Sequence, residues 1–517
     1  MNILNEIKIF KSYNTLRFPN IFNQRENMYK QFARPYHRGG SFMESEGYMD
    51  YSIRSIAEQF SKIIRTKEQK EVLTMNAILN RLSVSLVLPT IARDMNIPEL
   101  YNNRLQTVRR ILKELNRLVN VGYIDEIVIV DGSRNPDGTI NHRYMRDILH
   151  IAYSQIELFR DEVNMIRRYK SVRNQAERGL FKTIVKIFSQ FDTNINIILN
   201  YHGIVERIGI EGIPPGKGAA LWLTIPICSG DIIGFFDSDN RNFKSNSVIR
   251  MVHPIVAGFK EPGKEVSVEF IKAFYKRLKI SIGEGGKGTF SIGGRVTRLV
   301  ALPLANILTK KFNILKGVEK FKYPLSGEVA ATRMVHEELE YPVDYGVEVM
   351  TLAQIVRKLA PERIGETDIE IFQHWSQPEE KTEGMVYQVA RGIFSSLTSE
   401  ELNAIDLKTL IEEYVKEAKE VLKKWRETIV PFIEEISEEL GMIYLKIPEE
   451  KEEMRIKRYT EIIERVFTEI KTETKKTKVL PSWNSVTGRM EYESLRQQLE
   501  KASLRATFRI LELEGLV

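Results

Sequence analysis

The sequence predicts an α/β protein built on a mainly parallel sheet flanked by helices, and three segments support this prediction. Residues 84–89 form a short apolar run ended by a proline, which is typical of a buried strand. Residues 103–118 carry apolar side chains at helical spacing, and residues 124–130 form a second strand-like run. A strand, a helix and a second strand in this order make a right-handed βαβ unit with parallel strands.

The ends of these two strands hold the first candidate ligand positions. Open parallel sheets bind ligands at the carboxyl ends of their strands. Residues 89–94 and the segment Asp131-Gly132-Ser133 lie at two such ends. Capping of the following turn accounts for Asp131 equally well.

Composition narrows the class of protein. The 517 residues include 76 Lys and Arg against 69 Asp and Glu, a net charge of +7, and 43% of them are apolar, as in ordinary globular proteins. This excludes a disordered or fibrous chain, and the small positive surplus does not call for nucleic acid as a partner. The single cysteine, Cys228, excludes an intrachain disulfide and favours a reducing compartment. Without an apolar stretch of ~18 residues or a signal-peptide core, we expect a cytoplasmic protein with no membrane contact.

The sequence pattern divides the chain into three regions. Residues 1–81 are irregular and then helical, residues 82–378 alternate β-rich and helical runs, and residues 379–517 are mainly helical. Residues 135–200 are expected to form a helical insertion, whose cluster of basic residues fits a solvated face better than a surface for RNA or a phosphorylated partner. The amphipathic stripe over 409–440 predicts a helix packed on the middle region. Subunit contacts are its alternative role, and we expect a homodimer or larger homo-oligomer.

A glycine-rich segment in the middle region suits phosphate. Gly216-Lys217-Gly218 stands just before a helical run, where free backbone N–H groups and the positive end of the helix dipole attract anions. Lys217 adds a positive charge, although the spacing is not that of a Walker A loop. A plain joint between loop and helix is the alternative.

Two carboxylates two residues apart follow a buried strand. The apolar run 232–236 leads into Asp237-Ser238-Asp239, and alternate residues of an extended chain share a face. Paired hard oxygen ligands beside a phosphate loop favour Mg²⁺ or Mn²⁺, which would neutralise charge on a departing diphosphate. Many such pairs of aspartates belong to solvated turns, but the buried strand before this pair favours a metal site.

Four further motifs occur in a fixed order at residues 272–277, 293–298, 324–333 and 345–348. Together with the segments above, they resemble the glucosyl-3-phosphoglycerate synthases, which are retaining glycosyltransferases of the GT-A, Rossmann-like fold. The resemblance covers about residues 82–378, and the two flanks would be helical extensions. It implies a transfer of glucose from UDP- or GDP-glucose to 3-phosphoglycerate, the first step in making the compatible solute glucosylglycerate.

The resemblance also implies roles for individual residues. The donor would be held by Pro89, Thr90, Ile91, Arg93, Ser133, Lys217, Asp237, Tyr345 and Glu348. The acceptor would be held by Gly294, Arg295, Val296 and Thr297, and we add Lys276 and Arg277, which match a basic pair of the family. Asp239 and His374 would bind the metal, and the catalytic set would be Lys217, Asp237, Asp239 and Glu348.

For the chemistry, we expect transfer on one face of the sugar with retention of configuration. A departing diphosphate oxygen would take the acceptor proton, and Glu348 would contact sugar hydroxyls rather than act as a nucleophile. The family's Asn-Glu pair after the first strand is absent from residues 89–94, so the sequence does not decide whether the donor carries UDP or GDP. The alternatives are a mannosyl donor or another glycerate-like acceptor, and a noncatalytic nucleotide-sugar or nucleic-acid binding protein.

Overall fold

The computed structural model describes residues 49–50, 82–92, 97–258, 268–282, 288–374, 379–440, 443–474 and 478–517. The predicted helical extension over residues 1–81 therefore lies outside the described residues, apart from the short strand β1 (Met49–Asp50). Arg93, a predicted donor contact, also lies outside them.

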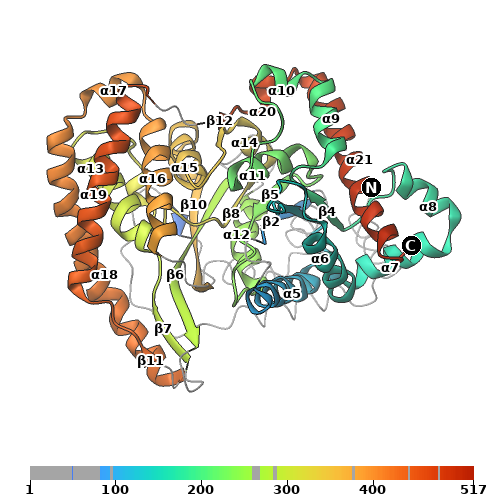
Figure 1. Ribbon diagram of the computed structural model, residues 1–517, viewed down its shortest axis with the longest axis horizontal. Coiled ribbons are helices and arrows are strands. Elements are labelled where there is room, and N and C mark those ends of the chain that lie inside the picture. Colours follow the sequence, from blue (N-terminus) through green and yellow to red (C-terminus); the bar gives the residue numbers. More distant parts are fainter. Residues whose placement is uncertain are drawn as a thin grey trace, which may run out of the picture.

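A twisted, mainly parallel sheet forms the centre of the molecule (Figure 1). Its strand order is β1-β10-β6-β8-β5-β2-β3-β4. The main strands are β2 (Val84–Thr90), β3 (Glu126–Asp131), β4 (Val185–Ser189), β5 (Ile232–Phe235), β6 (Phe270–Ile282), β8 (Val329–Thr332) and β10 (Ile364–His374). Strands β5, β2, β3 and β4 are parallel neighbours, whereas β8 runs antiparallel to β5 and β6. The predicted α/β class with a mainly parallel sheet is confirmed.

Helices cover both faces of the sheet because the central strands are apolar on both sides. Leu86 and Leu88 of β2 pack in a core with the helices of one face, and Val87 packs in the core of the other face. The first face carries α5 (Pro98–Asn120), α6 (His142–Gln155) and α12 (Ser245–Gly258). The second face carries α9 (Thr193–Tyr201), α11 (Lys217–Ile227), α13 (Leu302–Lys310) and α15 (Val347–Lys358).

Shorter elements connect these layers. They are α10 (Ile204–Arg207), the π-helical turn η1 (Thr297–Ala301), the 3₁₀ turns η2 (Val318–Lys320) and η3 (Pro361–Arg363), α14 (Arg333–Glu338), β7 (Gly288–Ile292) and β9 (Tyr341–Pro342). Strand β7 extends the sheet beside β6, and β9 pairs outside the main sheet with β12 (Val479–Leu480).

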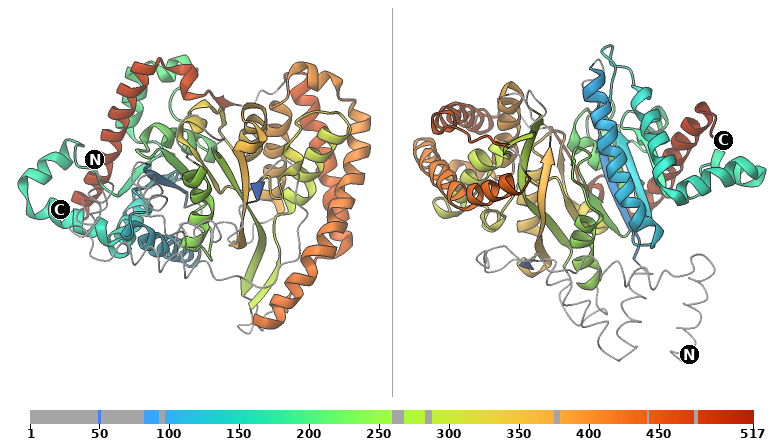
Figure 2. Two further views of the ribbon diagram at one scale, coloured as in Figure 1. Left: turned by 180° about the vertical axis from the view of Figure 1, so that it is seen from behind. Right: turned by 90° about the horizontal axis from the view of Figure 1, so that it is seen from below.

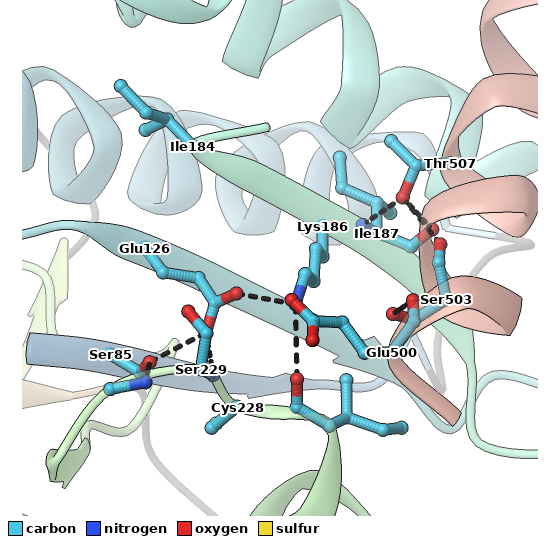
Figure 3. Close-up of polar contacts among 12 residues, drawn as sticks. Ser85, Glu126, Ile184, Lys186, Ile187, Cys228, Ser229, Glu500, Ser503 and Thr507 are labelled. Carbon is cyan, nitrogen blue, oxygen red and sulfur yellow. Dashed lines mark hydrogen bonds and ion pairs between the residues drawn. The ribbon is translucent and has the colours of Figure 1, made fainter. Parts of the chain in front are cut away.

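The region expected to be a helical insertion, residues 135–200, differs from that expectation. It contains α6, α7 (Glu157–Arg168), α8 (Lys170–Glu177) and α9, but also β4, which is fully buried and pairs in parallel with β3. Helix α6 packs on the sheet, so this region is largely a crossover of the fold. The charged Lys186 interrupts the apolar pattern by which β4 could be recognised in the sequence. Its ammonium is buried 2.5 Å from Glu126 and 3.2 Å from Glu500 (Figure 3).

The C-terminal helices share the core of the molecule. They are α16 (Glu379–Ser395), α17 (Ser399–Ala404), α18 (Leu407–Leu440), α19 (Glu449–Lys471), α20 (Trp483–Val486) and α21 (Arg489–Leu513), with the short strand β11 (Ile443–Tyr444). Helix α18 lies beside α13 and α19 packs against α16 and α18, whereas α21 lies at the opposite edge of the sheet near β4 (Figures 1 and 2). Tyr414 of α18 donates a hydrogen bond to the carbonyl of Leu299, and Trp483 stacks on Trp222 with ring centroids 4.0 Å apart. Within the described ranges, no helix combines the length and the apolarity that crossing a membrane requires.

Candidate active site

A cavity of about 800 Å³ opens at the carboxyl ends of β2, β3 and β5. Its walls come from the loops after these strands, the start of α11, the end of β6, the segment before η1 and the start of α15. Helices α16 and α19 of the C-terminal region close the remaining side. The expectation that ligand positions gather at these strand ends fits this location.

Lys217 is the first residue of α11 and is held between two carboxylates. Its Nζ lies 2.5 Å from Asp237 Oδ1 and 2.9 Å from Glu348 Oε1. Burial lowers the pKa of Lys217, but the attraction of Asp237 and Glu348 outweighs burial and holds this pKa well above its usual value. The three predicted side chains therefore form one cluster, in which the ammonium keeps its charge.

The glycines beside Lys217 allow the helix to start where it does. Gly216 has φ of 139°, which side chains rarely allow, and a Cβ on Gly218 would come within 1.8 Å of the Pro342 carbonyl oxygen. The start of α11 therefore packs directly against β9. Lys217, the first residue of the helix, lines the cavity at this point.

The two aspartates after β5 both line the cavity. The backbone N–H of Asp237 donates to Glu328 Oε1 at 3.3 Å, and burial, reinforced by Asp237, raises the pKa of Glu328 to about 7. Asp239 is half-buried, and its buried Oδ1 has no hydrogen-bond partner among the described residues. Burial first, and the nearby Asp237 second, raise the pKa of Asp239. A buried carboxylate oxygen in this setting fits a cation as its missing partner.

His374 ends β10 and lines the same cavity, buried to 8% exposure. A Cβ on Gly293 would come within 2.7 Å of His374 Nε2, so the glycine backbone leaves this ring nitrogen its space. No group of three or more His, Cys, Asp or Glu able to hold a metal occurs in the described part of the chain. One carboxylate and one imidazole therefore fit a divalent cation only if ligand oxygens complete its shell.

The predicted acceptor segment forms one wall of the cavity. Gly294, Arg295, Val296 and Thr297 all line it, at the entrance to η1. Gly294 has φ of 70°, and a Cβ there would lie 2.6 Å from the Tyr323 hydroxyl oxygen. Arg295 donates a hydrogen bond to Thr382 of α16, which fixes this segment to the C-terminal region.

The predicted basic pair on β6 is divided by the alternation of the strand. Arg277 lines the cavity, but Lys276 does not. The Lys276 ammonium lies 3.7 Å from Asp368 and 4.9 Å from the ring centroid of Phe432. Because successive side chains of a strand point to opposite faces, the two residues could not both face one ligand.

The predicted donor residues are largely brought together. Pro89, Thr90, Ile91 and Tyr345 line the cavity with the Lys217 cluster. Ser133 is not among the lining residues, because its hydroxyl donates to Asp131 and accepts from the backbone N–H of Ala92 at 2.8 Å. It supports the loop after β2 from behind.

Three groups of lining residues were missed in the sequence. Gln190 follows β4 and donates to the Pro214 carbonyl at 2.6 Å, and recognition of β4 as a strand would have identified it. Arg104 lies on α5, one turn after the start of its apolar stripe. The basic residues from α16 and α19 carry no local signal, because tertiary packing alone brings them to the cavity.

The parallel sheet, the Gly-Lys-Gly start of α11 and the Asp-x-Asp turn after β5 together define a nucleotide-sugar glycosyltransferase of the GT-A class. The family model described as mannosyl-3-phosphoglycerate synthase matches residues 150–446. This match covers more than half of the chain, and the chain belongs to that family.

Similar proteins carry a related name. The glucosyl-3-phosphoglycerate synthase of Petrotoga mobilis is 32% identical over 244 residues, which cover 47% of this chain and 67% of the relative. The enzyme of the same name from Mycolicibacterium paratuberculosis is 33% identical over 208 residues, covering 40% and 59%. The chain thus spans about three fifths to two thirds of these relatives.

Among solved structures, the glucosyl-3-phosphoglycerate synthase of Mycobacterium tuberculosis in complex with Mn²⁺, UDP and phosphoglyceric acid is similar to this chain. The similarity has a TM-score of 0.41 and 23% identity, and covers 63% of this chain and 82% of the other.

Proposed function

We propose that this protein is a retaining, metal-dependent glycosyltransferase that transfers glucose from a nucleoside diphosphate glucose, UDP- or GDP-glucose, to 3-phosphoglycerate. The observation that carries the proposal is the cluster of Lys217, Asp237 and Glu348, in one cavity with Asp239 and His374. The names of the relatives support the donor sugar and the acceptor. The name of the matching family supports a second candidate, the same transfer with a mannosyl donor.

The diphosphate of the donor binds at the start of α11. Lys217 lines the cavity at this position, and an ammonium and the start of a helix both favour negative charge. Asp239 and His374 would hold Mg²⁺ or Mn²⁺, which neutralises negative charge on the departing diphosphate when it is bound. Glu348 and Tyr345 line the cavity at the start of α15 and contact the sugar.

The acceptor lies against the segment Gly294–Thr297. Backbone N–H groups, the Thr297 hydroxyl and the guanidinium of Arg295 suit an anionic acceptor. The acceptor hydroxyl attacks the anomeric carbon on the face from which the diphosphate departs. Its proton passes to the departing phosphate oxygen, and the new bond keeps the configuration of the old one.

The proposal includes a cytoplasmic location, a homo-oligomeric assembly and no requirement for nucleic acid or membrane. The single cysteine of the chain, Cys228, is buried, and burial raises its pKa far above the usual range of a thiol. It would therefore stay reduced and unreactive in the cytoplasm.

The test is release of nucleoside diphosphate from UDP- and GDP-glucose and UDP- and GDP-mannose, with and without 3-phosphoglycerate and with and without Mg²⁺ or Mn²⁺. We expect release with one glucose donor, only when both acceptor and metal are present. Release with a mannose donor alone would establish the second candidate. The variant Asp239→Asn should lose the metal-dependent rate by at least 100-fold, and normal rates in it would refute the site.

A further inference from the structure

The cavity has a strongly basic side that the donor residues do not explain. Among its described lining residues, nine are Lys or Arg and four are Asp or Glu. Asp237 and Glu348 are engaged by Lys217, and Asp344 pairs with Arg391 of α16. Three of the four acidic lining residues are therefore engaged by cations outside the lining group on the side of η1, α16 and α19, and the fourth, Asp239, is the predicted metal ligand.

Helix α19 provides the centre of this basic side. Lys451 and Arg455 are four residues apart on α19, so their side chains share one face of the helix, and both line the cavity. Lys446, just before the helix, lines it as well. Lys451 and Arg455 lie beyond residue 446, where the match to the family ends, and the family resemblance assigns them no role.

A buried ion pair fixes α19 to the acceptor segment. Glu452 Oε1 lies 3.0 Å from Arg298 Nη2, with the two side chains 4% and 3% exposed. Glu452 Oε2 also lies 3.3 Å from Arg455 Nη1. Arg298 belongs to η1, whose first residue is Thr297 of the predicted acceptor segment. The basic face of α19 is therefore held next to that segment, although the two are 154 residues apart in sequence.

The guanidiniums of Arg298 and Arg455 share one carboxylate, that of Glu452, which leaves a net positive charge beside the cavity. Burial lowers the pKa of Arg298, the attraction of Glu452 partly offsets this effect, and repulsion from Arg455 lowers the pKa again. A bound anion would relieve this repulsion, and a guanidinium beside an ammonium suits a doubly charged phosphate better than a single carboxylate.

We propose that Lys451 and Arg455 of α19 form the subsite for the phosphate group of the acceptor, with the Glu452–Arg298 pair as the element that positions them. This proposal rests on the proposed function for the identity of the acceptor. The segment Gly294–Thr297 then faces the carboxylate end. The C-terminal region thereby selects a phosphorylated acid over an unphosphorylated one.

The experiment compares Lys451→Met with Lys457→Met, an exposed lysine of α19 that does not line the cavity. Binding of 3-phosphoglycerate and of inorganic phosphate is measured by calorimetry on the full chain, and binding of the nucleoside diphosphate is measured as a separate titration. We expect Lys451→Met to weaken both phosphate ligands at least tenfold, to raise the KM for 3-phosphoglycerate with little change in kcat, and to leave the nucleoside diphosphate unaffected. Lys457→Met should match the wild type throughout.

A second variant guards against a folding defect, because Arg455 is largely buried. Arg455→Lys keeps the charge and should show an intermediate loss, with an unfolding temperature close to that of the wild type. Unchanged phosphate binding in Lys451→Met, or an equal loss of nucleoside diphosphate binding, would overturn the proposal. If no sugar is transferred to 3-phosphoglycerate but Lys451→Met still weakens inorganic phosphate, the proposed function fails and the anion subsite stands.

Discussion

Replacement of Lys217 by methionine tests the charge cluster at the centre of the site. The ammonium is the shared partner of Asp237 at 2.5 Å and Glu348 at 2.9 Å. Methionine fills a similar volume but carries no charge. Two carboxylates that were held together by one cation would then face each other in a poorly solvated space.

The size of the effect follows from this geometry. Both carboxylates lie within hydrogen-bond distance of one atom, so their oxygens are about 5 Å apart, and two like charges at that separation repel by about 3 kcal/mol at an effective dielectric constant of about 20. Removing one partner from a buried ion pair typically costs about 3–5 kcal/mol. The three side chains keep 10–21% exposure, which favours the lower end of that range. We therefore expect Lys217→Met to lower the free energy of unfolding by about 3 kcal/mol.

Urea unfolding followed by far-ultraviolet circular dichroism measures this loss, with Lys310→Met as the matched control. Lys310 is 60% exposed and lies 3.6 Å from Glu417, so its removal should cost less than about 0.5 kcal/mol. The double variant Lys217→Met with Glu348→Gln removes the repulsion and should recover about half of the loss. If Lys217→Met is as stable as the control, or if Glu348→Gln recovers nothing, the reasoning about the cluster is refuted.

Three further predictions concern the rest of the fold. Lys186→Met should destabilise the protein by about 3–5 kcal/mol in urea, because Glu126, 3% exposed, loses its cation, and a loss below 0.5 kcal/mol would contradict this. Burial lowers the pKa of His336 to about 4, so the unfolded chain takes up the proton first as the pH falls. Stability should drop between about pH 6.5 and pH 4 by up to about 3 kcal/mol from this residue, and His336→Phe should flatten that part of the curve in pH-dependent unfolding. Trp483→Ala removes a ring that is fully buried against Trp222 and should cost about 3–5 kcal/mol in thermal unfolding, whereas an unchanged midpoint would show that this stack is dispensable.

The central strands could be predicted from the sequence because local chemistry determines them. The apolar runs at 84–89 and 124–130 correspond to β2 and β3, which are buried on both faces. Strand β4 was missed because its second residue is the charged Lys186. The burial of Lys186 depends on Glu126 and Glu500, which lie 60 residues before it and 314 residues after it. No local sequence pattern could therefore predict this strand.

The site shows the same division between local and tertiary information. The start of α11 and the Asp-x-Asp turn follow directly from glycines and a buried strand, and both reach the cavity. The expectation for Lys276 ignored the two-residue period of a strand, which separates it from Arg277. The basic face of α19 could not have been predicted, since its place depends on the buried Arg298–Glu452 pair.

The C-terminal helices cannot be treated as an appendage, because they complete the sheet itself. Strand β4 is an edge strand in the described sheet, and the hydroxyl of Thr507 accepts from the N–H of Ile187 at 2.8 Å and donates to its carbonyl at 3.1 Å (Figure 3). Helix α21 thereby satisfies the polar groups that an exposed edge would offer to another chain, while Glu500 of the same helix helps to neutralise Lys186. A chain ending near residue 378 would lose this cover and the basic face of α19 together. Its aggregation would therefore say nothing about native subunit contacts, and the oligomeric state has to be measured on the full chain.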